Sequence, residues 1–553
     1  MSSTNFNHGV EVTTVSDQAP AVRTVKTSVI GIVITAGKGP LLTPTLINGN
    51  RRQAIATFGA YSNNGDGFSG PEAFNGIFEQ GGASIVAINV CDPATNRTVL
   101  AADPIVFNEV TDKAKAAHPY LIAATGVLAA AAAAPINLSS ARQWTVPTGV
   151  TITGVFVSEG GTAIALGAGV SQYAIAAGVL TLGSNYATNK TAWVTYTVAS
   201  FVENTDFTVD RETGIFSRLS TAPKLLRGSK LNVGYTYVDP TTVTEAQVIV
   251  GINLLASAAS VVRVRPRILL APRFTQAFDP LTHTSVANAV ITALNTVAKM
   301  LGARVFSDAC NTTKEDAVIH GQFFSGEGDR VCMHFPNHLV RLPDGTDGIQ
   351  PASIRLAGLR AVVDNDEGFW TSESNHKIQG IIGLSVALSH GSDVLGTGGV
   401  ETDTNYLNSH GVSTTVWNDA DTRGGNFRSW GNRQLNGEFL SVQRTADMVN
   451  ESLAIAIAGA VDKNISRGLL AYVLEEGRDY LRSLEARGAL MPNPSPNKID
   501  DMWADPELNS PESVSLGELH IDYRINPPFP AERIVLRAHL TREYVTALFA
   551  TAI

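Results

Sequence analysis

The sequence predicts a multidomain protein of mixed α/β and α+β class, and three observations support this. The chain has 553 residues, which at roughly 150 residues per domain suggests three or four domains. Apolar residues make up 44% and charged residues 16% of the chain, so several cores can be buried. Buried strands alternate with amphipathic helices in two regions, and a strand-rich region rich in turn residues separates them.

Residues 1–22 form a polar N-terminal segment that we expect to be an extended arm. Val10, Val12 and Val15 favour a strand, but few apolar neighbours are present for it to pack against. Because an isolated strand is unstable in water, such an arm would have to borrow a partner. A frayed terminus explains the composition equally well.

Residues 23–115 are predicted to form a small α/β unit. Residues 28–40 indicate a buried strand that ends in a turn. A helix is expected over 71–80, because Pro71 can begin it and Gly81-Gly82 can end it. A second buried strand follows over 83–90.

Residues 116–240 have a different character and predict an inserted β-rich domain. Alternating or β-branched runs occupy 150–157, 192–198 and 231–238. The Ala-rich stretch 120–138 has the length of a membrane span, but Gly126 and Pro135 interrupt it and bulky apolar residues are few. We expect a short helix or linker there.

Residues 241–395 repeat the α/β pattern and predict a parallel βαβ layer. An amphipathic helix over 284–301 is followed by Gly302 as its C-terminal stop. A further helix is expected near 313–324. The expected strands are 268–270, 304–307 and 331–335.

Residues 396–540 predict an α+β domain, and residues 541–553 an apolar C-terminal arm. Residues 445–487 are expected to be largely helical, and the second part keeps one apolar stripe between charged sides. The runs 519–525 and 533–540 predict a hairpin. A soluble protein does not normally leave a tail as apolar as YVTALFATAI free in water, so it should dock on something.

Charge and cysteine content exclude several classes of function. The chain has 41 basic and 50 acidic residues, a net charge of −9, and no basic cluster that would fit nucleic acid or an anionic membrane. The N-terminal residues lack the pattern of a signal peptide. Three cysteines, Cys91, Cys310 and Cys332, form no disulfide framework and suit a reducing compartment.

No motif predicts catalysis, a cofactor or a metal. The sequence 36–40 lacks the spacing of a phosphate-binding loop, and no Gly-x-Ser-x-Gly elbow is present. Cys332, His334 and His338 form the best metal candidate, but nothing supplies the remaining ligands, so a buried thiol and ordinary histidines are favoured. Residues 364–368 are expected to be a solvated turn rather than a calcium loop.

Several segments of the last third resemble a known family. Residues 426–433 end in Trp430-Gly431-Asn432-Arg433, which resembles the W-G-N-R signature of contractile phage tail sheath proteins and, as in that family, precedes a helical segment. Sheath subunits of phage-tail-like bacteriocins are similar. Three further segments match the family in the same order along the chain: 80–83 its N-terminal unit, 237–244 the end of its inserted β domain, and 522–534 its closing hairpin.

The resemblance implies a structural subunit rather than an enzyme. Such subunits stack as hexameric rings around a tail tube, between baseplate and terminator proteins, and contract to drive the tube through the bacterial envelope for genome delivery. The family implies a central domain similar to subtilisin in fold without protease activity, a virion location after assembly in the host cytoplasm, no cofactor, no nucleic-acid contact and no direct membrane insertion. It also implies arms that add strands to neighbouring subunits, carried here by Val10, Val12, Val15, Tyr544, Leu548 and Phe549.

Two placements remain hypotheses of our own. The charged helix 466–488, with Arg478, Arg482 and Arg487, is expected to face the tube, and the β-rich domain 116–240 is expected to face outward. Two alternative functions stay open at this point. One is another self-assembling shell protein, and the other is a hydrolase on the 241–395 domain.

Overall fold

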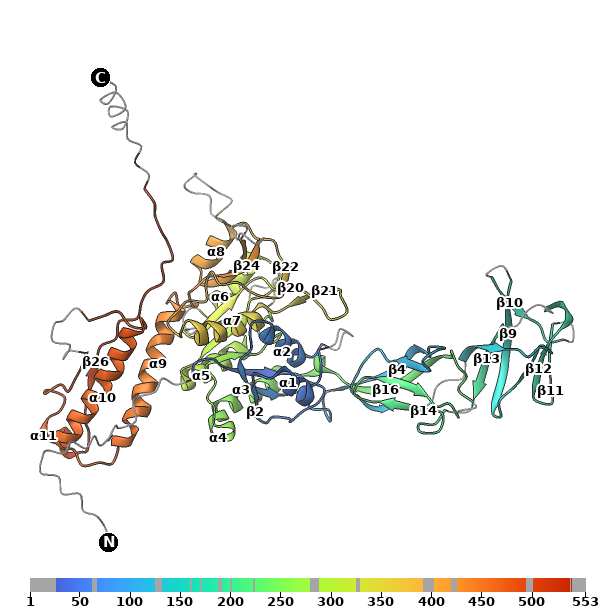
Figure 1. The fold of residues 1–553 in the computed structure, drawn as a ribbon, viewed down its shortest axis with the longest axis horizontal. Coiled ribbons are helices and arrows are strands. Elements are labelled where there is room, and N and C mark those ends of the chain that lie inside the picture. The colour runs from blue at the N-terminus through green and yellow to red at the C-terminus, as the bar shows by residue number, and fades with distance from the viewer. Residues whose placement is uncertain are drawn as a thin grey trace, which may run out of the picture.

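The protein consists of three parts arranged in a row, as the computed structural model in Figure 1 shows. A central α/β body lies between a β-rich module on one side and a C-terminal helical unit on the other. The structure describes residues 26–537 and 539, except for 62–66, 125–131, 160–161, 170–171, 187–190, 199–200, 222–223, 279–287, 325–328, 391–401, 419–424 and 494–500.

A mostly parallel eight-stranded sheet forms the centre of the body, in the order β2-β3-β1-β17-β18-β19-β23-β24. The strands from β3 to β23 are parallel, and β2 and β24 at the two ends are antiparallel to their neighbours. The strands are β1 (Val29–Ile34), β2 (Thr45–Asn48), β3 (Ser84–Asn89), β17 (Ile268–Leu270), β18 (Arg304–Asp308), β19 (Val331–His334), β23 (Val412–Asn418) and β24 (Asn426–Trp430).

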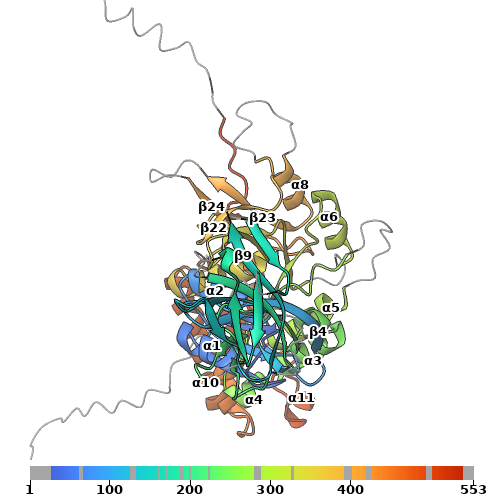
Figure 2. The same ribbon diagram turned by 90° about the vertical axis from the view of Figure 1, so that its right-hand side faces the viewer.

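Helices cover both faces of this sheet, which explains why its strands are continuous apolar runs. In β1, Val29 and Val33 belong to one core, and the alternate residues Ile30 and Ile32 belong to the other. Figure 2 shows α1 and α2 on one side of the body and α3, α5 and α6 on the other. The helices are α1 (Arg51–Phe58), α2 (Ser69–Glu79), α3 (Glu245–Ala256), α4 (Ala258–Val262), α5 (Ala289–Leu301), α6 (Lys314–Gln322), α7 (Ala352–Asp366) and α8 (Asp403–Ser409).

The predicted parallel βαβ layer is confirmed, but the expected division of the body is wrong. Residues 23–115 do not form a separate unit, because β1 pairs with β3 on one side and with β17 on the other. The 396–540 segment likewise contributes β23 and β24 to the same sheet. Parallel hydrogen bonding and burial on both faces determine which strands are neighbours in this sheet. Separation along the chain does not determine it.

The β-rich module begins at β4 (Arg97–Val106), earlier than the predicted residue 116, and ends at β16 (Lys230–Val238). These two strands pair along their length. Arg97 lies opposite Val238 next to the body, and Val106 lies opposite Lys230 further out. The other strands are β5 (Lys113–Lys115), β6 (Leu121–Ala124), β7 (Ala132–Asn137), β8 (Gln143–Thr145), β9 (Val150–Glu159), β10 (Thr162–Leu166), β11 (Tyr173–Ala176), β12 (Val179–Leu182), β13 (Thr191–Val198), β14 (Phe207–Asp210) and β15 (Ile215–Arg218), with short 3-10 helices at Ser184–Tyr186 and Pro240–Thr242.

The predicted strands near 150, 192 and 231 are confirmed as β9, β13 and β16, but the helix or linker expected over 120–138 is wrong. That stretch contains β6 and β7, which pair with β16 and β13 respectively. The helix propensity of alanine is a small energy per residue, and hydrogen bonding to neighbouring strands overrides it. The sheet therefore determines the local structure.

The C-terminal unit consists mainly of two helices, as predicted for 445–487. They are α9 (Leu440–Ile457) and α10 (Arg467–Ala486), followed by β25 (Met502–Trp503), α11 (Pro511–Ser515) and β26 (Asp522–Tyr523), with a 3-10 turn at Ala458–Ala460. A small sheet of β20 (His338–Arg341), β21 (Asp347–Gln350) and β22 (Ile381–Leu384) belongs to the body.

The hairpin predicted from 519–525 and 533–540 is wrong. Within the described residues of these two runs, only Asp522 and Tyr523 are in a strand, and they pair with β25. Residues 533–537 are exposed and have no regular structure. Pro527, Pro528 and Pro530 lie between the two runs, and proline cannot donate to a strand ladder.

Candidate functional site

Three central strands of the sheet have an arginine at their amino end, and helix α9 lies across that edge. Arg304 begins β18, and Arg330 directly precedes β19. Arg304 forms an ion pair with Asp447 of α9, with Nη2 2.6 Å from Oδ2, and Arg330 Nη1 donates a hydrogen bond to the same oxygen at 2.6 Å. Arg267, next to β17, forms an ion pair with Glu451, which lies one turn further along α9.

Burial makes these ion pairs a firm connection between helix and sheet. The side chains of Arg267 and Arg304 are each only 2% exposed. Desolvation lowers the pKa of Arg304 to about 10, and the carboxylate of Asp447 opposes that shift, so the guanidinium stays charged at neutral pH. Moving α9 away would leave buried cations without a counter-charge, which is strongly unfavourable.

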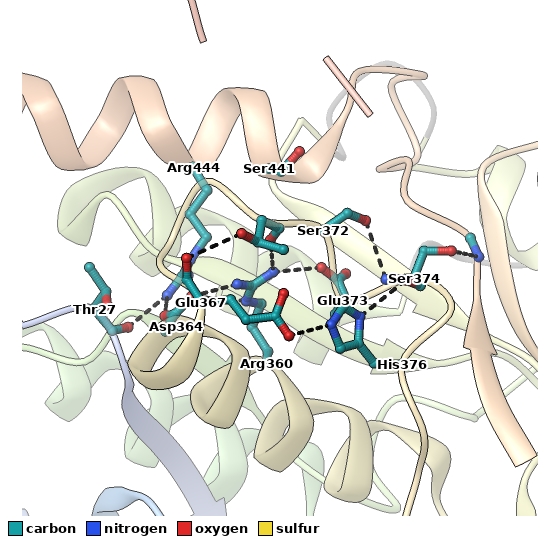
Figure 3. A network of polar contacts seen from close by, with 12 residues as sticks. Thr27, Arg360, Asp364, Glu367, Ser372, Glu373, Ser374, His376, Ser441 and Arg444 are labelled. Atoms are coloured by element: carbon teal, nitrogen blue, oxygen red, sulfur yellow. Dashed lines mark hydrogen bonds and ion pairs between the residues drawn. The ribbon is translucent and has the colours of Figure 1, made fainter. Parts of the chain in front are cut away.

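A second group of buried charges continues this connection into helix α7 (Figure 3). Asp364 accepts hydrogen bonds from Arg360 on its own helix, at 3.0 Å from Nε, and from Arg444 on α9. Arg360 Nη1 also donates to Glu373 Oε2 at 2.8 Å and to the carbonyl of Thr371 at 2.7 Å. Two cations and two anions therefore share a site from which water is excluded.

The same group reaches two further parts of the chain. Arg444 Nη2 donates to the carbonyl of Thr27, just before β1, at 2.6 Å. The loop after α7 is held by His376 against Glu367 at 2.8 Å, and the Ser374 hydroxyl accepts from the backbone N–H of Gly431 in the W-G-N-R segment at 3.1 Å. We call the Arg360–Asp364–Arg444–Glu373 group and the α9 ion pairs of Asp447 and Glu451 the charged joint.

The solvated turn expected over 364–368 is therefore wrong at Asp364, whose side chain is fully buried. Its partner Arg444 lies 80 residues away in sequence. Sequence reasoning also missed Asp447 and Glu451, although charged residues at helical spacing on a partly buried helix gave a usable signal.

The carboxyl edge of the sheet, where enzymes with this layer arrangement bind substrates, holds a different polar group. Asp308, at the end of β18, accepts hydrogen bonds from both the backbone N–H and the hydroxyl of Ser353. Burial raises the pKa of Asp308 to about 6, against the effect of these bonds. Ser353 is thus paired with a carboxylate and not with the nearby buried His334, so these three do not form a catalytic triad.

The metal candidate is not assembled in the structure. Cys332 and His334 are two residues apart on the buried strand β19. The third candidate, His338, has its Nε2 2.9 Å from the hydroxyl of Thr415. No group of three or more metal-capable side chains occurs in the part of the chain that the structure describes. All three cysteines are buried and free, and burial raises the pKa of Cys91 to about 12 and that of Cys310 to about 11.

The three arginines predicted to face the tube lie on or just after α10, in three different settings. Arg478 is mostly buried and donates to the carbonyl of Met502 at 3.0 and 2.7 Å. Arg482 is 40% exposed and pairs with Asp479 at 2.9 Å. Arg487 lies over the ring of Trp370, 5.3 Å from its centre. The predicted arm residues Val10, Val12, Val15, Tyr544, Leu548 and Phe549 lie outside the described residues.

The extended three-part fold with a central, mostly parallel sheet defines a multidomain α/β protein, and comparison with known proteins identifies its family. A family model described as the phage tail sheath C-terminal domain matches residues 438–541. The tail sheath protein of Burkholderia phage BcepMu is 28% identical over 560 residues, covering 98% of both chains. A putative prophage major tail sheath protein of Pseudomonas aeruginosa strain UCBPP-PA14 is 30% identical over 311 residues, covering 55% of this chain and 72% of that protein.

The chain therefore belongs to the tail sheath protein family. It is a structural component of the phage tail and not an enzyme. Among solved structures, the helical sheath of the anti-feeding prophage in its contracted state covers 98% of this chain and 100% of that chain, with 14% identity and a TM-score of 0.49. No helix among the described residues is both long and apolar enough to span a membrane.

Proposed function

We propose that this chain polymerises as stacked hexameric rings around a tail tube and contracts to drive that tube through the bacterial envelope for genome delivery. The observation that supports this most strongly is the similarity to the BcepMu tail sheath protein along 98% of both chains. In this proposal the subunit assembles in the host cytoplasm and becomes part of the virion. Its partners are further copies of itself, the tube protein, and baseplate and terminator proteins.

The proposed contraction is a rigid-body change between two packings of the same subunit. The charged joint couples body and C-terminal unit, so that they move together, and the arms 1–22 and 541–553 keep neighbouring subunits linked by added strands. A free-energy gap per subunit between the two packings, multiplied over many subunits, is then sufficient and needs no cofactor.

The three parts have distinct places in this proposal. The body, subtilisin-like in fold, carries the ring contacts. The C-terminal unit faces the tube, and the β-rich module faces outward, as its position at the opposite end of the subunit suggests. With a net charge of −9 and no basic cluster, the subunit is suited neither to nucleic acid nor to an anionic membrane surface, and the proposal includes no direct membrane insertion.

The tube-facing role is best tested at Arg482. Arg478 also holds the carbonyl of Met502, so changing it would disturb the fold as well as any contact with the tube. Arg482→Glu should leave folding intact and raise the fraction of contracted particles in electron micrographs of assembled tails. Arg211, an exposed arginine paired with Glu203 on the β-rich module, offers a matched control as Arg211→Glu. Equal fractions for both variants would contradict the placement.

The proposal as a whole is tested by expressing residues 1–553 alone and imaging the product by negative-stain electron microscopy. We expect long striated hollow tubes, because sheath subunits without a tube should polymerise in their lower-energy form. Deleting residues 1–20 should abolish the tubes. A monomer that stays monomeric at high concentration would refute self-assembly.

A further inference from the structure

Arg433, the last residue of the W-G-N-R segment, contacts the chain that leads to the C-terminal arm. Its Nε lies 2.9 and 3.1 Å from the two carboxylate oxygens of Glu532, and its Nη2 lies 2.5 Å from one of them. Nη1 donates to the carbonyl of Gly437, and the guanidinium lies 4.1 Å from the centre of the Phe439 ring. The side chain is thus fixed on three sides while it binds Glu532.

A second contact holds the same stretch three residues earlier. The ring of Phe529 meets the ring of Phe439 edge to face, with centres 6.1 Å apart. Pro527, Pro528 and Pro530 restrict the backbone of this stretch, because each fixes its own φ and disfavours helix in the residue before it. Residues 527–532 therefore form a stiff segment that is attached at Phe529 to Phe439, just before α9, and at Glu532 to Arg433.

The chain changes character directly after Glu532. Residues 533–537 are exposed throughout, and Ile534, Val535 and Leu536 expose 76%, 64% and 90% of their surface. Three adjacent apolar side chains in water, followed by the apolar sequence of the C-terminal arm, require a partner. In Figure 1 this red-brown stretch runs away from the C-terminal helices alongside the body.

We propose that Arg433 is a clasp that fixes where the C-terminal arm leaves the subunit, so that the arm pivots at residue 533 and reaches a second copy of this chain. The proposal rests on the proposed function, in which the arm links neighbouring subunits. It assigns the arginine of the W-G-N-R segment a positioning role: a fixed exit point aims the arm at one neighbour.

The energetics support positioning rather than stability. Arg433 and Glu532 retain 33% and 40% exposure, and ion pairs that exposed contribute little to folding. The site instead fixes the orientation of the bound carboxylate, because a planar guanidinium can bind a carboxylate through two nitrogens and stack on a ring at the same time. Lysine carries the charge but offers no such fork, so Arg433→Lys separates geometry from charge.

The clasp can be measured by the distance between two spin labels. The labels are attached at Ser409→Cys, on the exposed end of α8, and at Ala531→Cys, an exposed position inside the segment 527–532; the three native cysteines are buried and should not react. In the full-length chain, diluted to keep it monomeric, we expect a narrow distance distribution that broadens in Arg433→Lys and in Glu532→Gln. Arg482→Lys, the same substitution in an exposed ion pair on α10, is the matched control and should leave the distribution narrow.

Tube formation gives the second readout. Arg433→Lys should lower the yield of tubes by up to about fivefold, the limit set by the small energy of an exposed ion pair. The loss arises because an arm without a fixed direction loses more conformational freedom on binding its neighbour. An unchanged distance distribution would overturn the clasp, and so would a broadened distribution with a normal tube yield. If the unaltered chain forms no tubes, the proposed function fails, while the distance measurement still decides whether Arg433 holds the segment.

Discussion

Replacing Asp364 with Asn tests whether the charged joint holds the C-terminal unit to the body. The carboxylate is fully buried between Arg360 and Arg444, whose side chains are 0% and 1% exposed. Asparagine keeps the shape and one acceptor oxygen, but it removes the negative charge and turns an N–H₂ donor toward a guanidinium. The buried group then holds two cations and a single anion, Glu373.

The expected magnitude follows from burial. Removing one partner of a buried ion pair costs about 3–5 kcal/mol, because the remaining charge has neither water nor a counter-ion. In a domain of roughly 250 residues about 1 kcal/mol corresponds to about 2 °C, so the melting temperature of the body should fall by about 6–10 °C. The matched control is Asp479→Asn, also in an Arg–Asp pair on a helix, but 73% exposed. It should cost less than about 1 kcal/mol.

Calorimetry of the full-length chain under conditions that keep it monomeric measures both variants, with far-ultraviolet circular dichroism to verify that they fold. Losses that agree within about 1 kcal/mol for Asp364→Asn and Asp479→Asn would refute the reasoning, because buried and exposed pairs must then be equivalent. If Asp364→Asn does not fold, Arg444→Lys tests the same joint. It keeps the charge but loses the planar donor group, so its loss of unfolding free energy should exceed that of Asp479→Asn.

Two further predictions concern pH and the outer module, and a third concerns α10. Burial lowers the pKa of His320 to about 4 and that of His334 to about 3, so below pH 6.5 these groups bind protons in the unfolded chain but not in the folded chain. Each group then lowers the free energy of unfolding by about 1.4 kcal/mol per pH unit. Burial also holds the pKa of His338 well below 6.5, so this group adds a similar loss, whereas Asp308, with its pKa raised to about 6, acts in the opposite direction below pH 6. The free energy of unfolding from urea titrations should therefore show a net loss of about 2–3 kcal/mol between pH 6 and 5 that is smaller in His320→Gln. Deleting 98–237 should leave a folded body that forms thinner tubes in electron micrographs, because within the described residues the module shares no strand with the body sheet. Arg482→Glu should change the free energy of unfolding by less than about 0.5 kcal/mol in urea titrations, so that any effect on assembled tails reports a contact between chains.

The sequence was sufficient to predict those helices and strands that are determined by residues within or directly next to the element. The run Val29–Ile34 is apolar throughout, because helices cover both faces of its sheet, and such a run is recognisable without its neighbours. The helix Ala289–Leu301 likewise carries its own stripe, its Asn288 cap and its Gly302 stop. Pairing is not local: β1 lies between β3 and β17, and the whole β-rich module separates those two strands along the chain.

The pairing of α9 with the rest of the charged joint could not be predicted, because Arg444, Asp447 and Glu451 pair with residues that are distant in sequence. Asp364 lies in a run of acidic residues that resembles a solvated turn, and only the packing of α9 brings Arg444 against it. The exposed run 533–537 is the opposite case. Its apolar residues predicted a strand, but within the described part of the subunit it joins no sheet, which is consistent with a segment that pairs only after assembly.

The joint and the clasp differ in strength in a way that suits an assembly whose subunits move as rigid bodies. Leaving one charge of a buried pair in the joint without its partner costs about 3–5 kcal/mol, whereas an exposed pair such as Arg433–Glu532 is worth about 0–1 kcal/mol. A force applied to the subunit would therefore release the arm's exit point long before it separated α9 from the sheet. Deformation would then be concentrated in the exit segment 527–533, while the body and the C-terminal unit keep their mutual orientation.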